Sequence, residues 1–241
     1  MHRALGIALD WDLLANNPAG RVSPPRVDQE EIIILNAAQI KEILKKARGR
    51  PIYQIGALAL ATGMRRGELL ALRWQDVDMD VGKITVARSL EQTKAGGLRF
   101  KEPKTRHGRR TIGLPVSAVS DLRAHWKATQ EMRLALGAGK SPPDSLLFAD
   151  VNGEPRKPNA VTKEWGRTAS MAKQPQATLH SLRHTHASHL IAAGLDILTI
   201  SRRLGHGSPA VTLSVYAHLF PQTDDRAAIA IEGAMTEART E

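Results

Sequence analysis

The sequence predicts a mainly helical α+β fold in which a small antiparallel β-sheet is inserted among the helices. Apolar residues recur at helical spacing over most of the 241 residues, whereas β-branched pairs and glycine turns are confined to a stretch between Lys83 and Leu114. Hydrophobic residues make up 42% of the chain. Because this is enough apolar material for a sizeable core, we exclude an intrinsically disordered protein.

The first predicted element is a helix from Ala4 to Asn16, since five apolar residues fall on one side of it: Leu5, Ile7, Ala8, Trp11 and Leu14. Proline, glycine and arginine become frequent from Pro18 to Val27, which predicts an exposed linker. Asn36 is then a candidate N-cap for a helix with an apolar face. A buried helix is expected to follow at Ala57 to Leu60.

The predicted sheet lies between Lys83 and Leu114, where Ile84 to Val86 and Thr111 to Ile112 are β-branched. Gly96 to Gly97 and Arg106 to Gly108 supply the turns that an antiparallel arrangement needs. Helical spacing returns in three segments, which run from Val116 to Leu136, from Asn159 to Met171 and from His180 to about Ala234. We expect breaks in the last of these near Gly194, Gly205 to Pro209 and Phe220 to Pro221.

The charge of the chain narrows the class of partner. Lysine and arginine total 34 against 24 acidic residues, giving a net charge of +10, which favours a polyanion such as nucleic acid. Cysteine is absent, so disulfide scaffolds, thiolate metal sites and cysteine nucleophiles are excluded. No apolar run is long enough to span a bilayer, and the first residues lack the apolar core of a signal peptide. We therefore expect a cytoplasmic protein with no membrane partner.

The first candidate site residue is Arg65, in the segment Thr62-Gly63-Met64-Arg65-Arg66-Gly67-Glu68. A helix is predicted to break at Gly63 and another to begin near Arg66, which would put Arg65 at a helix start, beside free backbone N–H groups that favour an anion. An arginine there could hold a phosphate through two parallel hydrogen bonds. Arg66 is a rival for this role, and an ordinary surface pair of Arg65 with Glu68 is the alternative.

Lys104 belongs to a predicted basic hairpin tip, Pro103-Lys104-Thr105-Arg106-His107-Gly108-Arg109-Arg110. Such a tip could contact a nucleic-acid backbone without sequence preference. A lysine on a mobile tip could also donate a proton to a leaving alkoxide.

The remaining candidates lie in the last third of the chain. His180 and Arg183 are three residues apart, so one helix face could bring both to the same phosphate. Six of the 9 histidines lie between residues 180 and 218, yet the sequence contains no His-Glu-x-x-His motif and no cysteine, so we do not expect a metal site. Tyr216 follows His206 by ten residues, and an ordinary core aromatic is its alternative interpretation.

Taken together, these segments resemble the tyrosine recombinase or phage integrase family from about Leu35 to Phe220. Five segments match in the order of the family: Thr62-Gly63-Met64-Arg65-Arg66-Gly67-Glu68-Leu69, Pro103-Lys104-Thr105, His180-Ser181-Leu182-Arg183-His184-Thr185, Leu204-Gly205-His206 and Tyr216. The resemblance implies an integrase-type catalytic domain. It also implies that Arg65 and Arg183 clamp the phosphate, that His180 and His206 belong to the site, that Lys104 is the lysine of the sheet, and that Tyr216 is the nucleophile.

The resemblance further implies a function, which is site-specific recombination of double-stranded DNA through a covalent 3′-phosphotyrosine. His180 would take the proton of Tyr216 and Lys104 would protonate the leaving 5′ oxygen. The sequence has no Gly-x-x-x-x-Gly-Lys-Ser/Thr loop, and neither a cofactor nor a divalent ion is expected for this chemistry. The alternatives are a noncatalytic or truncated DNA-binding accessory protein and a type IB topoisomerase that relaxes supercoils.

The expected domain organisation also follows the resemblance. Residues 1–28 would be the last helix and linker of a preceding core-binding domain, residues 29–220 the catalytic domain, and residues 221–241 a C-terminal helix and tail that docks on a neighbouring subunit or packs on its own. The implied partners are DNA, further copies of the chain in a tetramer on DNA, and accessory DNA-bending proteins. The protein would be associated with the nucleoid.

Overall fold

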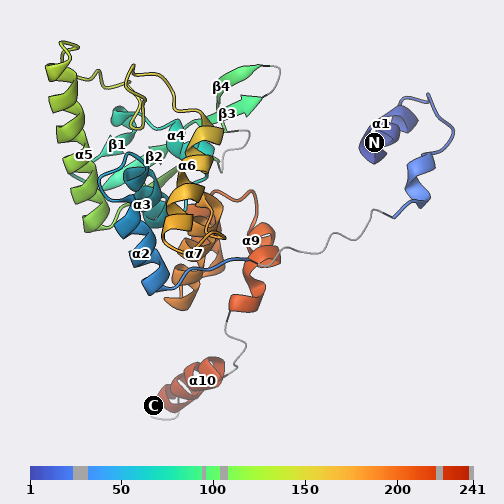
Figure 1. The fold of residues 1–241 in the computed structure, drawn as a ribbon. Coiled ribbons are helices and arrows are strands. Elements are labelled where there is room, and N and C mark those ends of the chain that lie inside the picture. Colours follow the sequence, from blue (N-terminus) through green and yellow to red (C-terminus); the bar gives the residue numbers. More distant parts are fainter. Residues whose placement is uncertain (24–31, 94–95, 104–107, 221–224, 239–241) are drawn as a thin grey trace. The chain divides into compact units, whose positions relative to one another are not determined.

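The computed structural model describes residues 1–23, 32–93, 96–103, 108–220 and 225–238, and the chain divides into two compact units, Met1–Glu31 and Ile32–Glu241. The first unit contains α1 (His2–Asp10) and a short 3-10 helix, Pro18–Arg21 (Figure 1). The prediction that the first helix reaches Asn16 was wrong. Asp12 adopts the left-handed conformation with φ at 54°, which an α-helix cannot continue through.

The second unit contains the expected mixture of helices and short strands. Its elements in chain order are α2 (Ala37–Ala47), α3 (Ile52–Thr62), α4 (Arg66–Leu70), β1 (Val77–Asp78), β2 (Lys83–Val86), β3 (Ser89–Thr93), β4 (Gly97–Lys101), β5 (Arg110–Gly113), α5 (Val116–Ala135), α6 (Pro158–Met171), α7 (Leu179–Ala192), α8 (Ile197–Leu204), α9 (Pro209–Tyr216) and α10 (Asp225–Ala238).

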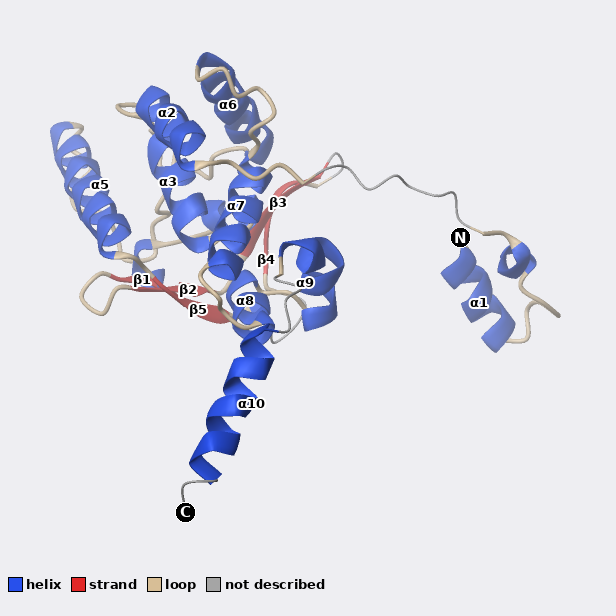
Figure 2. Ribbon diagram, turned by 90° about the horizontal axis from the view of Figure 1, so that it is seen from below, coloured by secondary structure: helices blue, strands red, loops and turns tan. Residues whose placement is uncertain are grey.

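The described strands β2 to β5 lie between Lys83 and Leu114, as the sequence predicts, whereas β1 precedes this stretch. The described strands form two small antiparallel sheets rather than one (Figure 2). In the first sheet β2 lies between β1 and β5, and Ile84 is paired with Ile112. Because side chains alternate along a strand, Ile84, Val86 and Ile112 are buried on one face. The second sheet pairs β3 with β4, and Leu90 is its buried residue.

Helix α3 forms the centre of the main core. It is apolar around most of its circumference, and Ile52, Ile55 and Leu58 on it are buried. Gly56 lets α6 approach closely, because a Cβ at this residue would lie 2.1 Å from the ring of Trp165. The indole nitrogen of Trp165 donates a hydrogen bond to the Ala177 carbonyl, just before α7. The packing of α6 and α7 against α3 thereby fixes α7, which carries several site residues.

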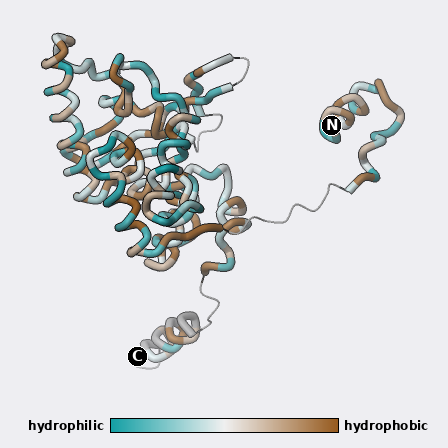
Figure 3. Tube along the Cα trace, viewed as in Figure 1, coloured by the Kyte–Doolittle hydropathy of each residue, from teal (hydrophilic) through white to brown (hydrophobic). Residues whose placement is uncertain are grey.

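A second, smaller apolar cluster connects α7, α8 and α9. Its buried members are Ala187, Ile191, Ile200, Leu204 and Tyr216. Figure 3 shows hydrophobic segments running through the packed helices, with hydrophilic segments between them. Among the described helices, none is both long and apolar enough to cross a membrane.

Candidate active site

Arg65 lies at a sharp break between two helices, as the sequence predicts. Helix α3 ends at Gly63, which adopts φ +65°, and α4 begins at Arg66. The Arg65 guanidinium donates to a Glu68 carboxylate oxygen at 3.1 Å and to the Gly205 carbonyl at 3.2 Å. Its side chain is still 44% exposed, so it has donors left for a ligand.

The rival arginine, Arg66, lies in a different environment. Its guanidinium donates to the Pro158 carbonyl and to the Thr162 hydroxyl, both on α6. These bonds hold Arg66 against α6, whereas Arg65 is bonded to Gly205, next to His206. The contacts therefore favour Arg65 as the arginine of the site.

Arg183 is buried in the second turn of α7, with 2% of its surface exposed. One guanidinium nitrogen donates to the Gly63 carbonyl at 2.6 Å and the other to the Leu204 carbonyl at 2.8 Å. Burial, together with the nearby Arg65, lowers the Arg183 pKa to about 10, so the guanidinium remains charged at neutral pH. Two helix ends thus hold a buried positive charge in a fixed orientation.

Tyr216 is the last residue of α9 and is 1% exposed. Its hydroxyl lies 2.8 Å from Nδ1 of His184, which follows Arg183 on α7. Burial raises the pKa of the Tyr216 phenol, and the charge of Arg183 partly opposes this effect. The nucleophile predicted from the sequence is therefore a protonated phenol next to the buried arginine.

The two predicted histidines approach the site from different elements. His180 lies in the first turn of α7, and its ring packs edge-on against that of His184 with the centroids 4.5 Å apart. His206 follows Gly205, which ends α8 in the left-handed conformation, and its Nδ1 lies 2.7 Å from the Thr212 hydroxyl on α9. Five of the six residues predicted from the sequence thus lie on elements joined by these contacts.

The three histidines near Arg183, His180, His184 and His206, all have lowered pKa values. Burial and the neighbouring arginines lower the pKa of His206 to about 4, and burial, His180 and Arg183 lower that of His184 to about 4. The pKa of His180 is also lowered, by burial, Arg183 and Arg65. A bound phosphate would relieve this positive field, so the charges of the site are suited to an anion.

Glu68 and Arg110 are site-supporting residues that the sequence analysis did not identify in this role. Arg110 holds both carboxylate oxygens of the buried Glu68, at 3.1 and 2.8 Å, and donates to the Arg203 carbonyl. Burial raises the Glu68 pKa, but hydrogen bonds and charge from Arg110 and Arg65 outweigh it and lower the pKa overall. Glu68 therefore stays ionised and holds Arg65 in place.

The sequence contains Glu68 and Arg110 in recognisable segments, but it does not indicate that the two residues form a buried pair. The sequence offers a surface pair of Arg65 with Glu68 as an alternative, whereas the structure buries Glu68, with 6% exposure. Arg110 was assigned to the basic hairpin tip, whereas it begins β5 and points its guanidinium inward. Lys104 lies outside the described residues.

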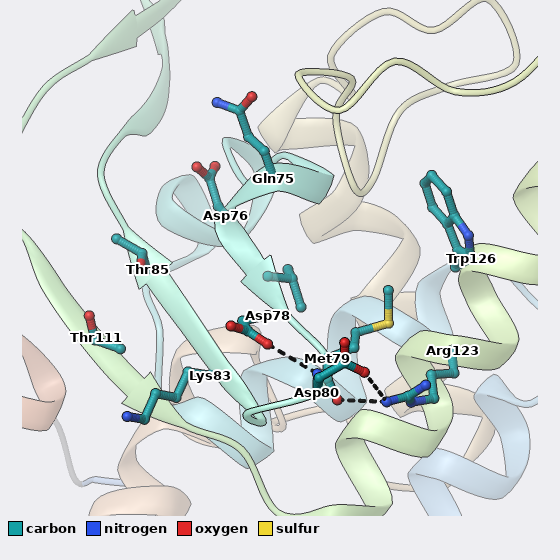
Figure 4. A pocket seen from close by; sticks show the side chains of 11 residues that line it. Gln75, Asp76, Asp78, Met79, Asp80, Lys83, Thr85, Thr111, Arg123 and Trp126 are labelled. Carbon is teal, nitrogen blue, oxygen red and sulfur yellow. Dashed lines mark hydrogen bonds and ion pairs between the residues drawn. The ribbon is translucent and has the colours of Figure 1, made fainter.

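The described residues contain no cluster of three or more histidine, aspartate or glutamate side chains that could hold a metal ion. A cavity of about 870 Å³ lies on the sheet of β1, β2 and β5 (Figure 4). Asp76, Asp78, Lys83 and Arg123 are among its lining residues, and Arg123 bonds to Asp80. Its lining includes none of Arg65, His180, Arg183, His206 and Tyr216, so the candidate active site is separate from it.

Comparisons with known proteins identify the family of the chain. The sequence profile of the phage integrase family matches residues 33–223. The chain is 28% identical over 231 residues to a XerC-like tyrosine recombinase of Caldanaerobacter subterraneus and 31% identical over 219 residues to the ICEBs1 integrase of Bacillus subtilis. Each alignment covers 89% of this chain, which spans only 59% and 58% of the lengths of these two relatives.

Solved structures show the same fold. The integrase of the Tn1549 transposon, in complex with transposon right end DNA, aligns with a TM-score of 0.77 and 23% identity, covering 97% of this chain and 76% of that one. The catalytic domain of bacteriophage HP1 integrase aligns with a TM-score of 0.54 and 24% identity, covering 82% and 94% of the two chains. With the family profile matched over residues 33–223, these findings establish that the chain belongs to the phage integrase family.

Proposed function

We propose that this chain cuts and rejoins strands of double-stranded DNA in site-specific recombination, with Tyr216 as the nucleophile. The observation that carries the proposal is the contact of a buried tyrosine with the helix that holds a buried arginine: Tyr216 ends α9, and its hydroxyl lies 2.8 Å from Nδ1 of His184, the residue after Arg183 on α7. Membership in the phage integrase family supports the same reaction.

In the proposed reaction the Tyr216 oxygen attacks a backbone phosphorus, and the bond from phosphorus to the 5′ oxygen breaks. The product is a 3′-phosphotyrosine and a free 5′ hydroxyl, and attack by a 5′ hydroxyl on the phosphotyrosine reverses the step without an external energy source. Lys104 protonates the leaving 5′ oxygen in this proposal. No bond energy is lost to water, so no high-energy cofactor is needed.

Arg65, Arg183 and His206 would stabilise the five-coordinate transition state, in which negative charge grows on the nonbridging oxygens. Such fixed donors act most strongly where water is excluded, and removing one costs roughly 3 to 4 kcal/mol in comparable sites. Arg183 has its orientation fixed by two carbonyls, and Arg65 is held by Glu68 and Gly205. Little rearrangement of these donors is therefore required during the reaction.

We test this function with Tyr216→Phe, which removes one hydroxyl and little apolar area. Wild-type protein and the variant are incubated with nicked suicide duplexes made from the DNA that flanks the gene, and covalent adducts are trapped with denaturant. We expect an adduct with the wild type and none with the variant, while DNA affinity and helix content stay nearly unchanged. An adduct that persists in the Phe variant contradicts the assignment of the nucleophile.

The proposal also covers the molecules with which the protein would assemble on DNA. The net charge of +10 supports binding to a polyanion, and we propose association with the nucleoid, a tetramer on DNA and help from accessory DNA-bending proteins. A noncatalytic accessory role is less favoured, because the chain keeps five candidate catalytic side chains on elements that contact one another. A topoisomerase is less favoured, because the comparisons give recombinases and integrases.

A further inference from the structure

The proton of the Tyr216 hydroxyl must leave during attack on phosphorus, and the structure identifies the atom it faces. A phenol has one proton and therefore donates one hydrogen bond at a time. The Tyr216 hydroxyl lies 2.8 Å from Nδ1 of His184, an ordinary distance for a hydrogen bond. When Nδ1 carries the lone pair, the Tyr216 hydroxyl donates its proton to His184, and the lone pairs of the same oxygen stay available for phosphorus.

His184 is in the right protonation state to accept that bond. Burial, His180 and Arg183 lower the pKa of His184 to about 4, so its ring is neutral at pH 7 and Nδ1 can carry a lone pair. The titratable and charged groups that face the His184 ring are His180 and Arg183 on its own helix and Tyr216 on α9. A phosphate bound by Arg65 and Arg183 would offset the positive field and make His184 more basic when the reaction begins.

His180, to which the sequence analysis assigned this role, is placed differently. Its ring packs edge-on against His184, whereas the ring that contacts Tyr216 is that of His184, with centroids 5.6 Å apart. His180 is exposed at the start of α7, while His184 lies one helical turn further on and is partly buried beside Tyr216. The position of His180 therefore suits contact with the DNA phosphate better than contact with the phenol.

We propose that His184 is a catalytic residue that takes the phenolic proton of Tyr216 when DNA is cleaved and returns it when the strand is rejoined. This inference rests on the proposed function. As the bond between the Tyr216 oxygen and phosphorus forms, the O–H bond breaks and the proton moves to Nδ1 of His184. In the reverse step, the tyrosine leaves phosphorus and recovers the proton from the same nitrogen, so protons balance over the two steps.

The kinetic test compares His184→Asn with His180→Asn. Asparagine places an amide oxygen near the position of Nδ1, so His184→Asn can keep the hydrogen bond but cannot take a proton. Suicide duplexes with a 5′-bridging phosphorothiolate are used throughout. Because sulfur leaves without protonation, the measured rate then no longer depends on proton donation by Lys104. The rate of adduct formation is measured from pH 6.5 to 9.

We expect the rate of His184→Asn to fall at neutral pH and to rise about tenfold per pH unit, since cleavage then depends on the small fraction of ionised phenol. The wild type and His180→Asn should show a nearly flat profile. A flat profile at the wild-type rate in His184→Asn overturns the proposal. A faster reaction would show that His184 restrains Tyr216, and a steep profile confined to His180→Asn would make His180 the proton acceptor; both results also overturn it.

A measurement without DNA tests the contact itself. The chain has 2 tyrosines, so ¹³Cζ labelling of tyrosine gives two NMR resonances, and Tyr53→Phe assigns the resonance of Tyr216. That resonance should shift in His184→Phe, which removes the acceptor, and should stay in place in His180→Asn. An unmoved resonance in a folded His184→Phe protein overturns the proposal. Failure of the wild type to form any adduct, with the resonance shifting as expected, would count against the proposed function instead.

Discussion

At the scale of single residues, Arg183 has a structural role beside the catalytic role that we propose for it. We predict that Arg183→Ala loses folding stability as well as cleavage, because the Gly63 and Leu204 carbonyls lose their buried donor. The cost should be roughly 2 to 4 kcal/mol of unfolding free energy. Arg183→Lys keeps the charge without the planar fork and should retain more stability than Arg183→Ala, yet still cleave slowly.

Denaturant unfolding and adduct formation, measured on the same preparations, separate the two roles of Arg183. Arg202→Ala is the matched control, since it removes an exposed positive charge from α8, whose end Arg183 contacts. It should change the unfolding free energy by less than about 0.5 kcal/mol. An Arg183→Ala protein as stable as the wild type would contradict the structural role.

His186 is a second buried residue, and it makes stability depend on pH. Its Nδ1 donates to the Leu60 carbonyl and its Nε2 accepts a hydrogen bond from Arg203. Burial and Arg203 lower its pKa from 6.5 to about 4. Between these values the unfolded chain binds a proton at this position and the folded chain does not, so unfolding free energy rises with pH across this window.

We therefore predict that the free energy of unfolding falls as pH is lowered from about 6.5 to about 4, by roughly 3 kcal/mol from His186. His184 and His206 act in the same direction. His186→Gln should be less stable at pH 7 but should show a shallower dependence on pH. Urea unfolding at several pH values checks this, and equal slopes in the two proteins would show that His186 is not responsible.

At the scale of elements, glycines end two helices beside the site. Gly205 ends α8 with φ +67°, and a Cβ there would lie 2.5 Å from the Arg110 guanidinium. We predict that Gly205→Ala costs more than the roughly 1 to 2 kcal/mol of left-handed strain, because Arg110 must shift and loosen its hold on Glu68. Adduct formation should fall with it, since the Gly205 carbonyl accepts from Arg65.

Gly137 provides the comparison for this prediction. It has nearly the same conformation, with φ +69°, but a Cβ there would meet nothing within 4 Å. Gly137→Ala should therefore lose only the strain and keep its cleavage rate. Unfolding free energies and adduct rates of both variants decide the matter, and equal losses would show that contact with Arg110 adds nothing.

Elements that are set by residues close together in sequence could be predicted, and pairings between distant segments could not. Asn36 caps α2 through a bond to the backbone of Gln39, three residues away, and the sequence showed this directly. The breaks at Gly63 and Gly205 are equally local. The division of the strands into two sheets was not predicted, because it depends on which distant strands pair: β2 pairs with β5 across the whole β3–β4 hairpin.

At the scale of the whole molecule, the site is assembled from segments that are far apart in sequence. The candidate residues of the site were predicted from their types and order, which resemble those of a known family. Their supporting contacts could not be predicted, since Arg110 reaches Glu68 across 42 residues and Tyr216 reaches His184 across 32. Such pairs exist only after α4, α7 and α9 have packed, and no local pattern in the sequence encodes them.

Assembly is the last property that we predict at this scale. We expect the free protein to be mainly monomeric and to form multimers on DNA through α10, on which Ile229 and Ile231 are exposed. One short helix offers less than the roughly 1,200 Å² of a stable interface, so DNA must first raise the local concentration of partners. Ending the chain after Phe220 should keep single-site binding and part of the adduct formation, while cooperative binding weakens.

Light scattering and gel-shift titrations of the intact and shortened proteins check this expectation. A milder variant, Ile229→Ser with Ile231→Ser, keeps the full length and tests the exposed apolar residues of α10, because serine removes apolar area without shortening the helix. Both changes should lower cooperativity on DNA and leave the scattering of the free protein unchanged. If cooperativity stays the same, or if the shortened protein becomes insoluble because a core is exposed, then α10 packs on its own subunit and other surfaces must join the copies on DNA.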